Sequence, residues 1–300
     1  MSGRFPSRLI LIGFIGALTG CARSTSEPPS PAEQPRPAEP PRPDIHPDRT
    51  TQPQLDIPAC CGREVLESGL ALAQRYRNEK IAQRRFSHAA FWEAVSAPVA
   101  SSALRTETVG RSINGREIRS VTFGEGPATV LLWSQMHGDE STASMALADL
   151  FGFLTGRDTS AVRDRLRRRL TITFVPMLNP DGAELFQREN AVGIDVNRDA
   201  RQLATPEART LKAVHERVRP QYGFNLHDQN ARTRVGAQGF PAAIALLAPP
   251  YDSAREYNEV RSRARLVAAA IARILEPELE GRIAKYDDSF NPRAFGDLMQ

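Results

Sequence analysis

The spacing of apolar residues predicts a succession of strands and helices from about residue 105 onward. Apolar runs typical of strands lie at residues 105–123, 129–133, 170–177 and 222–226. The first of these runs contains Asn114-Gly115, a strong turn signal, and is therefore predicted to be two strands. Apolar residues at helical spacing lie at residues 141–154, 205–218 and 254–275.

Residues 62–97 also carry an apolar stripe, although an interrupted one, and are predicted to be helical. Strands that alternate with helices predict an α/β fold, with a mixed, mostly parallel twisted sheet covered by helices on both faces. Functional groups of such folds gather at the carboxyl ends of the strands. His137 follows the strand predicted at 129–133, and His227 follows the strand predicted at 222–226.

The N-terminus is predicted to be a secretory signal peptide over residues 1–20. Arg4 and Arg8 precede an apolar core at 9–18 that is too short to cross a bilayer. Leu18-Thr19-Gly20-Cys21 resembles the bacterial lipobox, which implies cleavage before Cys21 and its lipidation. The resemblance also implies location at the outer membrane, because Ala22 and not an aspartate follows the cysteine. The alternative is an ordinary signal peptide with a coincidental cysteine.

Composition divides the rest of the chain into three parts. Residues 21–58 are rich in proline and poor in large apolar residues, which predicts a disordered linker. A leader helix region is predicted at 59–85 and a catalytic domain at 86–300. The adjacent Cys60 and Cys61 could be free, could bond to each other through a strained ring, or could bond between molecules.

The formal net charge of +4 does not indicate nucleic-acid binding. The clearest basic cluster, Arg163 to Arg169, alternates with apolar residues at helical spacing, so a solvated helix face explains it. No cysteine lies in the region with the strand-end histidines, which excludes a thiolate zinc site there.

The candidate chemistry centres on His137, Glu140 and His227. His137-Gly138-Asp139-Glu140 places an imidazole and a carboxylate three residues apart, and His227 supplies a second imidazole. A catalytic zinc site needs three protein ligands of this kind. A lone strand-end histidine is more often structural, so the remaining motifs decide between the two interpretations.

Those motifs resemble the zinc carboxypeptidase family, the carboxypeptidase A-like metallopeptidases, over roughly residues 86–300. Their order matches: Ser112-Ile113-Asn114-Gly115-Arg116, His137-x-x-Glu140, Asn179-Pro180-Asp181-Gly182, Arg188, Asn197-Arg198 and His227. The resemblance implies Zn²⁺ bound by His137, Glu140 and His227. It also implies that Arg188 stabilises the developing oxyanion and that Asn197 and Arg198 hold the substrate's terminal carboxylate, with Tyr286 as a residue that covers bound substrate. Structural alternatives are an ion pair of Arg198 with Asp195 or Asp199, a solvent-exposed helical position for Arg188, and a surface-loop tyrosine at 286.

One element of the family pattern is missing. The family uses a glutamate near the C-terminus as general base, and the glutamates after His227 lie on or near the helix predicted at 254–275. The chain is therefore expected to be either a C-terminally truncated enzyme or a zinc-binding relative without hydrolysis. In both cases zinc binding with very little peptide hydrolysis is predicted.

The resemblance implies a zinc metallocarboxypeptidase that acts on peptides with a free C-terminal carboxylate, with cell-wall peptides as one candidate substrate. The lipobox resemblance implies a lipid-anchored protein of the bacterial envelope, on the periplasmic face of the outer membrane. Two alternatives stay open: a non-catalytic zinc-containing peptide-binding lipoprotein, and a zinc-dependent deacylase of N-acyl amino acids.

Overall fold

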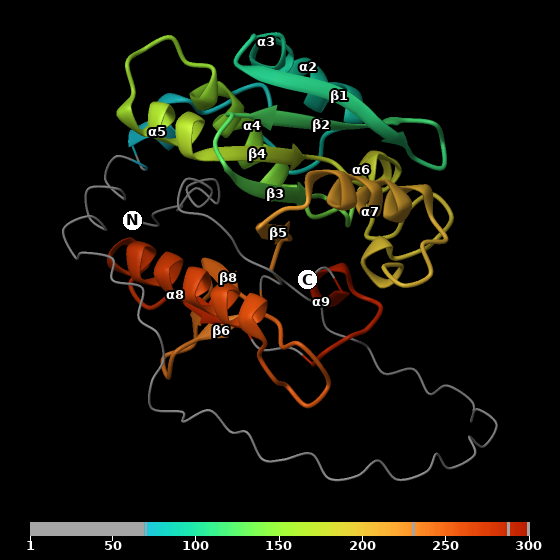
Figure 1. Ribbon diagram of the computed structural model, residues 1–300, viewed down its shortest axis with the longest axis vertical. Coiled ribbons are helices and arrows are strands. Elements are labelled where there is room, and N and C mark those ends of the chain that lie inside the picture. The colour runs from blue at the N-terminus through green and yellow to red at the C-terminus, as the bar shows by residue number, and fades with distance from the viewer. Residues whose placement is uncertain (1–68, 70, 230–231, 287–288, 299–300) are drawn as a thin grey trace.

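The computed structural model describes residues 69, 71–229, 232–286 and 289–298 (Figure 1). The predicted signal peptide, the lipidation site Cys21, the linker at 21–58 and most of the leader region before residue 71 lie outside the described residues. Within the described residues, no helix is both long and apolar enough to span a membrane.

A five-stranded mixed sheet forms the centre of the fold, as the alternating pattern predicts. Its strands are β1 (Leu104–Arg111), β2 (Glu117–Phe123), β3 (Ala128–Ser134), β4 (Leu170–Val175) and β5 (Tyr222–Leu226). They are arranged in the order β1-β2-β4-β3-β5. β1, β2 and β4 pair antiparallel, whereas β3 pairs parallel with both β4 and β5. β3 is therefore the central parallel strand, and the loops after β3 and β5 leave the same edge of the sheet.

Helices cover both faces of this sheet. They are α2 (His88–Ala94), α3 (Ser96–Val99), α4 (Thr142–Leu154), α5 (Ala161–Arg169), α6 (Pro180–Leu185) and α7 (Pro206–Val218). The apolar residues of α2 and α4 pack on one face, against Val130 and Leu132 of β3. Those of α7 pack on the other face, against Leu131 and Trp133. The alternation of β3 side chains thus fills two cores, which confirms the predicted two-sided α/β fold.

The single helical stretch predicted at 62–97 is wrong in its described part. The helix seen at 71–75 ends before a loop, and a new helix, α2, begins at His88. Ser87 causes this restart, because its side chain accepts a hydrogen bond from the Ala90 N–H and caps α2. The loop between the two helices brings Arg84 next to the loop after β3, where it contacts Asp139 and Ser141.

The basic cluster at 163–169 does form a helix, α5, as predicted. Arg163, however, is not solvated, because its side chain is buried and donates hydrogen bonds to Phe153 O and Asp158. Desolvation of this guanidinium is compensated by those acceptors. Sequence periodicity identified the helix but not the face on which Arg163 lies.

The C-terminal part builds a smaller unit beside the main sheet (Figure 1). It consists of β6 (Arg234–Val235), β7 (Phe240–Pro241), β8 (Ile244–Leu246), α8 (Glu259–Leu279), β9 (Ile283–Lys285) and α9 (Phe295–Leu298). α8 begins at Glu259, later than the predicted residue 254, because the Asn258 side chain caps it by accepting from Arg261 N–H. Leu275 and its neighbours in α8, β8 and β9 form a separate apolar cluster.

Candidate metal centre

His137, Glu140 and His227 converge at the carboxyl edge of the central sheet. β3 ends at Ser134, three residues before His137, and β5 ends at Leu226, directly before His227. Ser134 and Leu226 are paired in the parallel β3–β5 register, so the two loops leave the sheet side by side. The sequence prediction that these side chains lie together is therefore confirmed as a matter of geometry.

The Glu140 carboxylate lies between the two imidazoles. Its Oε1 is 2.8 Å from His137 Nδ1, and its Oε2 is 2.6 Å from His227 Nδ1. One potential ligand atom from each residue lies within 4.8 Å of the other two. Both imidazole side chains are 1% exposed and the Glu140 side chain is 15% exposed, so the cluster is shielded from water without being sealed.

Burial and hydrogen bonding move the pKa values of the three groups in different directions. Burial lowers the pKa of His137, but hydrogen bonds with Asp195 and Glu140 outweigh it and leave that pKa above its usual value. Burial lowers the pKa of His227, and Glu140 compensates only in part. Burial raises the pKa of Glu140, but the two imidazoles outweigh it and hold this pKa well below its usual value. Glu140 is therefore ionised, as a metal ligand must be.

Arg188 points into this cluster from the loop after α6. Its NH1 lies 3.1 Å from His137 Nδ1 and 3.4 Å from Glu140 Oε1. Its Nε and NH2 bind Asp195 Oδ2 at 3.0 and 2.9 Å. Arg188 is thus not the solvent-exposed helical residue of the alternative interpretation, because its guanidinium faces the three candidate metal ligands.

Asp195 connects Arg188 to His137, and its role was missed in the sequence. Its Oδ1 is 3.0 Å from His137 Nε2, the nitrogen on the far side of the ring from Glu140. A carboxylate in this place fixes the tautomer of a ligating histidine and orients its ring. The one signal in the sequence was the Asp-x-Asn-Arg spacing of 195–198. That spacing suggested Asp195 only as an ion-pair partner of Arg198.

Asn197 and Arg198 lie in the 3₁₀ turn Val196–Arg198 beside the cluster. Asn197 is buried, with Nδ2 3.4 Å from His227 Nε2 and Oδ1 accepting from Phe295 N–H. Within the described residues Arg198 forms no ion pair with Asp195 or Asp199. Asp195 binds Arg188 instead, and Asp199 accepts from the amides that precede α7. The ion-pair alternative for Arg198 is therefore not observed.

Tyr286 and the other described histidines lie away from the cluster. Tyr286 follows β9 and packs beside Ala245 and Ala284 in the C-terminal unit, and its predicted substrate role stays a prediction. His88 begins α2, with Nε2 2.8 Å from Glu117 O, and His215 lies in α7. Asp228 does not contact the His227 ring, because its carboxylate accepts from Thr142 N and Oγ1 at the start of α4.

Comparison with known proteins agrees with this geometry. Residues 90–235 match the family model described as zinc carboxypeptidase. This part of the chain belongs to the zinc carboxypeptidase family. The matched span contains His137, Glu140, Arg188, Asn197-Arg198 and His227, whereas Tyr286 lies outside it.

Individual relatives share this carboxypeptidase domain. Carboxypeptidase 2 of Trichophyton tonsurans is 28% identical over 160 residues, which are 52% of this chain and 29% of the relative. Human carboxypeptidase Z is 28% identical over 142 residues, 38% of this chain and 22% of the relative. The chain thus spans less than a third of the length of these relatives.

A solved structure supports the zinc carboxypeptidase fold. Bovine thrombin-activatable fibrinolysis inhibitor, in complex with tick carboxypeptidase inhibitor, superposes with a TM-score of 0.55 at 12% identity. The superposition covers 72% of this chain and 81% of that chain. It therefore extends beyond the span of the family match.

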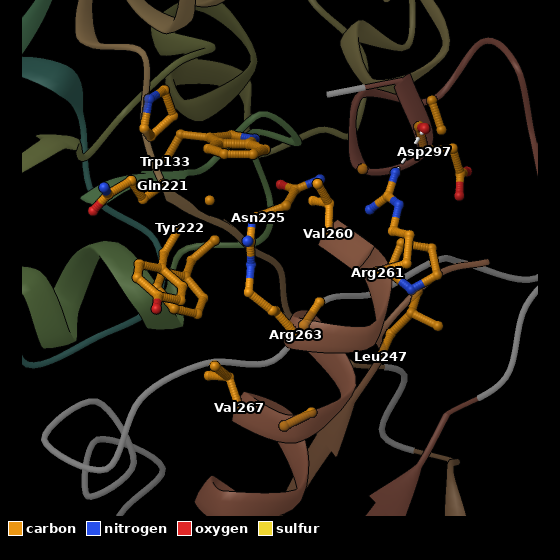
Figure 2. Close-up of a pocket in the computed structure, with 18 of the residues that line it drawn as sticks. Trp133, Gln221, Tyr222, Asn225, Leu247, Val260, Arg261, Arg263, Val267 and Asp297 are labelled. Carbon is orange, nitrogen blue, oxygen red and sulfur yellow. Dashed lines mark hydrogen bonds between the residues drawn. The ribbon is translucent and has the colours of Figure 1, made fainter. Parts of the chain in front are cut away.

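A groove lies beside Asn197, and Figure 2 shows its lining. β3, β5 and α8 line it, and the lining is mainly apolar, with Trp133, Val267 and Ile271 among its residues. Asn197 also lines the groove and contacts His227, so this residue connects the groove with the cluster, although His137, Glu140 and His227 do not themselves line it. The buried Trp133 Nε1 and Asn225 Oδ1 have no hydrogen-bond partner among the described residues.

Proposed function

We propose that this chain is part of a zinc metallocarboxypeptidase, binds Zn²⁺ through His137, Glu140 and His227, and recognises the C-terminal end of peptides at this site. The observation that carries the proposal is the convergence of these three side chains, inside the family-matched span, with Arg188 aimed at them. A fold similarity alone would leave the function open, because one fold serves many functions.

The residues present fit zinc. Two imidazole nitrogens and a carboxylate are the donor set of catalytic zinc sites, which keep a further position open. The second nitrogen of His137 already has a carboxylate partner, Asp195. Zinc at this place would polarise a scissile carbonyl and acidify water.

The basic and amide side chains beside the cluster support recognition of a peptide C-terminus. Arg198 donates from NH1 to Asn197 O and forms no ion pair within 4.0 Å among the described residues, so its guanidinium can form a two-pronged contact with the terminal carboxylate. Asn197 lies beside it and can complete the contact through its amide. Arg188 is placed to donate hydrogen bonds to the carbonyl oxygen of the scissile bond as negative charge develops on it.

The apolar groove would receive the side chain of the C-terminal residue (Figure 2). Its two arginines are already engaged, since Arg261 donates to Asp297 O and Arg263 pairs with Glu259. Arg261 also interacts electrostatically with the Asp297 carboxylate, whereas the Arg263–Glu259 pair lies at the exposed rim. An apolar or aromatic C-terminal residue is expected to bind better than a charged one.

Turnover is expected to be very low. The described glutamates that follow His227 lie in α8 or next to it: Glu256, Glu259, Glu276, Glu278 and Glu280. The general base of this chemistry must reach the attacking water within hydrogen-bond distance. We therefore expect zinc and peptide binding with little hydrolysis, and a peptide-binding role is the second candidate function.

The first experiment measures zinc by equilibrium dialysis and metal analysis. The wild-type chain should retain about one zinc per molecule, and His227→Ala should retain almost none, since two ligands do not replace three. His215→Ala, which changes a histidine of α7, is the matched control and should retain zinc. Unchanged zinc content in His227→Ala would refute the site.

The second experiment compares benzoyl-glycyl-phenylalanine with its C-terminal amide by calorimetry on the zinc-loaded chain. The free acid should bind at least about tenfold more tightly, because a charge-assisted contact is worth about 1.5–3 kcal/mol. Arg198→Gln should remove this preference, and the exposed Arg201→Gln should not. Equal binding of acid and amide would contradict a carboxylate site. Rapid hydrolysis of the peptide would contradict the expected low turnover, and rapid hydrolysis of an N-acyl amino acid would favour the deacylase.

The envelope location is a separate proposal that rests on the sequence near Cys21. We infer that the chain is lipidated there and anchored to the periplasmic face of the bacterial outer membrane. Expression with radiolabelled palmitate should label the wild-type chain and leave Cys21→Ser unlabelled. Labelling of Cys21→Ser would contradict the lipid anchor.

A further inference from the structure

Arg84 precedes the family-matched span yet contacts both loops that carry the proposed zinc ligands. Its NH2 donates to the main-chain oxygen of Asp139 at 2.9 Å and to Asp228 Oδ2 at 2.6 Å. Asp139 is the neighbour of Glu140, and Asp228 is the neighbour of His227. One guanidinium nitrogen therefore bridges the loop after β3 and the loop after β5.

Both ends of this bridge are fixed to the rest of the fold. The Asp228 carboxylate also accepts from Thr142 N and Oγ1, at 3.2 and 2.8 Å, which ties the loop after β5 to the start of α4. The main-chain oxygen of Arg84 accepts from Ser141 Oγ, so the backbone that carries the guanidinium is held as well. The Arg84 guanidinium lies 6.0 Å from the ring centre of Phe186.

The loops joined in this way have one further contact near the ligands. Asp228 N–H donates to Glu140 Oε2 at 3.3 Å, so a shift of Asp228 changes the position of a ligating carboxylate directly. The Asp228 side chain is only 12% exposed, and a buried carboxylate without a cation tends to move toward water. Arg84 is the cation that pairs with it.

We propose that Arg84 is a positioning residue, which holds Glu140 and His227 at the separation that zinc binding needs. This inference rests on the proposed zinc site. The chemistry favours arginine, because a planar guanidinium can bind a carbonyl and a carboxylate at fixed angles, whereas an ammonium on a flexible stem holds them less rigidly. The segment before the matched domain thereby becomes part of the functional unit.

The test compares the zinc dissociation constants of Arg84→Ala, Arg84→Lys and a neighbouring control, Arg85→Ala, by competition with a chelator of known affinity. Arg85 is exposed and forms no hydrogen bond or ion pair within the described residues. Arg84→Ala should weaken zinc binding about tenfold, the lower end of what outer partners of metal ligands contribute. Arg84→Lys should recover part of this loss, and Arg85→Ala should match the wild type.

Thermal unfolding in EDTA separates positioning from general stability. The midpoint of metal-free Arg84→Ala should fall somewhat below that of Arg85→Ala, because the mostly buried Asp228 loses its cation. The loss of zinc affinity should exceed what this lower midpoint accounts for. In an Asp228→Asn background, Arg84→Ala should cost clearly less zinc affinity than in the wild type, since the two residues act together.

Three results would overturn the inference. The first is a zinc affinity of Arg84→Ala within twofold of the wild type. The second is that Arg84→Ala costs as much zinc affinity in the Asp228→Asn background as in the wild type. The third is a fall in zinc affinity that the lower midpoint of the metal-free protein accounts for entirely. Failure of the wild-type chain to bind zinc would instead overturn the proposed function and this inference together.

Discussion

At the scale of single residues, the site depends on carboxylates that are not themselves proposed ligands. Asp195 accepts from Arg188 and faces His137 Nε2, so one side chain orients both a proposed ligand and a proposed oxyanion donor. Asp228 does comparable work on the other side of the cluster, where it joins Arg84 to the start of α4. The proposed zinc geometry thus depends on the carboxylates that orient the ligands as much as on the ligands themselves.

Asp195→Asn should weaken zinc binding about 10- to 100-fold, because an amide cannot support the imidazole as a carboxylate does. Asp199→Asn is the matched control. Asp199 is also buried, but it accepts from Ala204 N and Thr205 N. The Asp199→Asn variant should lose about 1–3 kcal/mol of folding stability and keep its zinc affinity. Chelator competition and urea unfolding measure the two effects. A wild-type zinc affinity for Asp195→Asn would contradict the assigned role.

The metal-free protein should be most stable near pH 6.5, the usual pKa of histidine. The pKa of His137 is raised, so its contribution to stability is complete below 6.5 and is lost as pH rises through the raised value. The pKa of His227 is lowered by burial, so stability is lost as pH falls below 6.5 and the unfolded chain takes up the proton.

Urea unfolding in EDTA between pH 5.5 and 8.5 tests this expectation. The decline of the free energy of unfolding above pH 6.5 should disappear in His137→Gln, which lacks the titrating group. It should also disappear in saturating zinc, because zinc takes the place of the proton. A wild-type stability that rises steadily to pH 8.5 without metal would show that the His137 contacts with Asp195 and Glu140 do not stabilise the fold.

At the scale of elements, the sequence predicted the strands and most helices well, because each buries a regular apolar face. β3, β4 and β5 follow their apolar runs, and Thr205 caps α7 as its residue type predicts. The pattern could not predict α6, where Asn179 caps a short helix instead of only ending a strand. It could not place Arg84 either, because contacts across 55 and 144 residues leave no local signal.

The loop after β3 also depends on close contact with the loop before α6. A Cβ atom added at Gly138 would lie 1.9 Å from the carbonyl carbon of Gly182, where no atom fits. Asn179 joins the same two loops, since its Nδ2 donates to Met136 O at 3.3 Å. The absence of a side chain at Gly138 is thus a condition for the position of the His137–Glu140 loop.

Gly138→Ala should therefore destabilise the protein by about 3 kcal/mol, the upper end of the usual cost of overpacking, and weaken zinc binding. Gly223→Ala is the matched control, because its added Cβ would meet only the Trp133 ring, at an ordinary 3.6 Å. Urea unfolding and chelator competition measure both variants. Equal stability of the two variants would show that the loops separate at little cost.

At the scale of the whole molecule, the described chain contains two structural units whose apolar cores differ in size. The main sheet lies between two large apolar cores, whereas α8, β8 and β9 share a small one of their own. Among the hydrogen bonds that join the units are Phe295 N to Asn197 Oδ1 and Ala200 N to Arg293 O. The proposed ligands all belong to the larger unit, which also contains most of the family-matched residues.

The smaller unit should therefore open independently. Leu275→Ala removes a buried side chain of its core, at a cost of about 2–5 kcal/mol. Because that core is separate, hydrogen exchange should accelerate in α8, β8 and β9 while β3 and β4 stay protected and zinc stays bound. Leu147→Ala, in the large core, should instead accelerate exchange in the main sheet. Mass spectrometry of exchanged peptides distinguishes the two variants. Equal acceleration of β3 and α8 in Leu275→Ala would show that the whole chain unfolds as one cooperative unit, and the groove between β5 and α8 would then be a rigid part of the site.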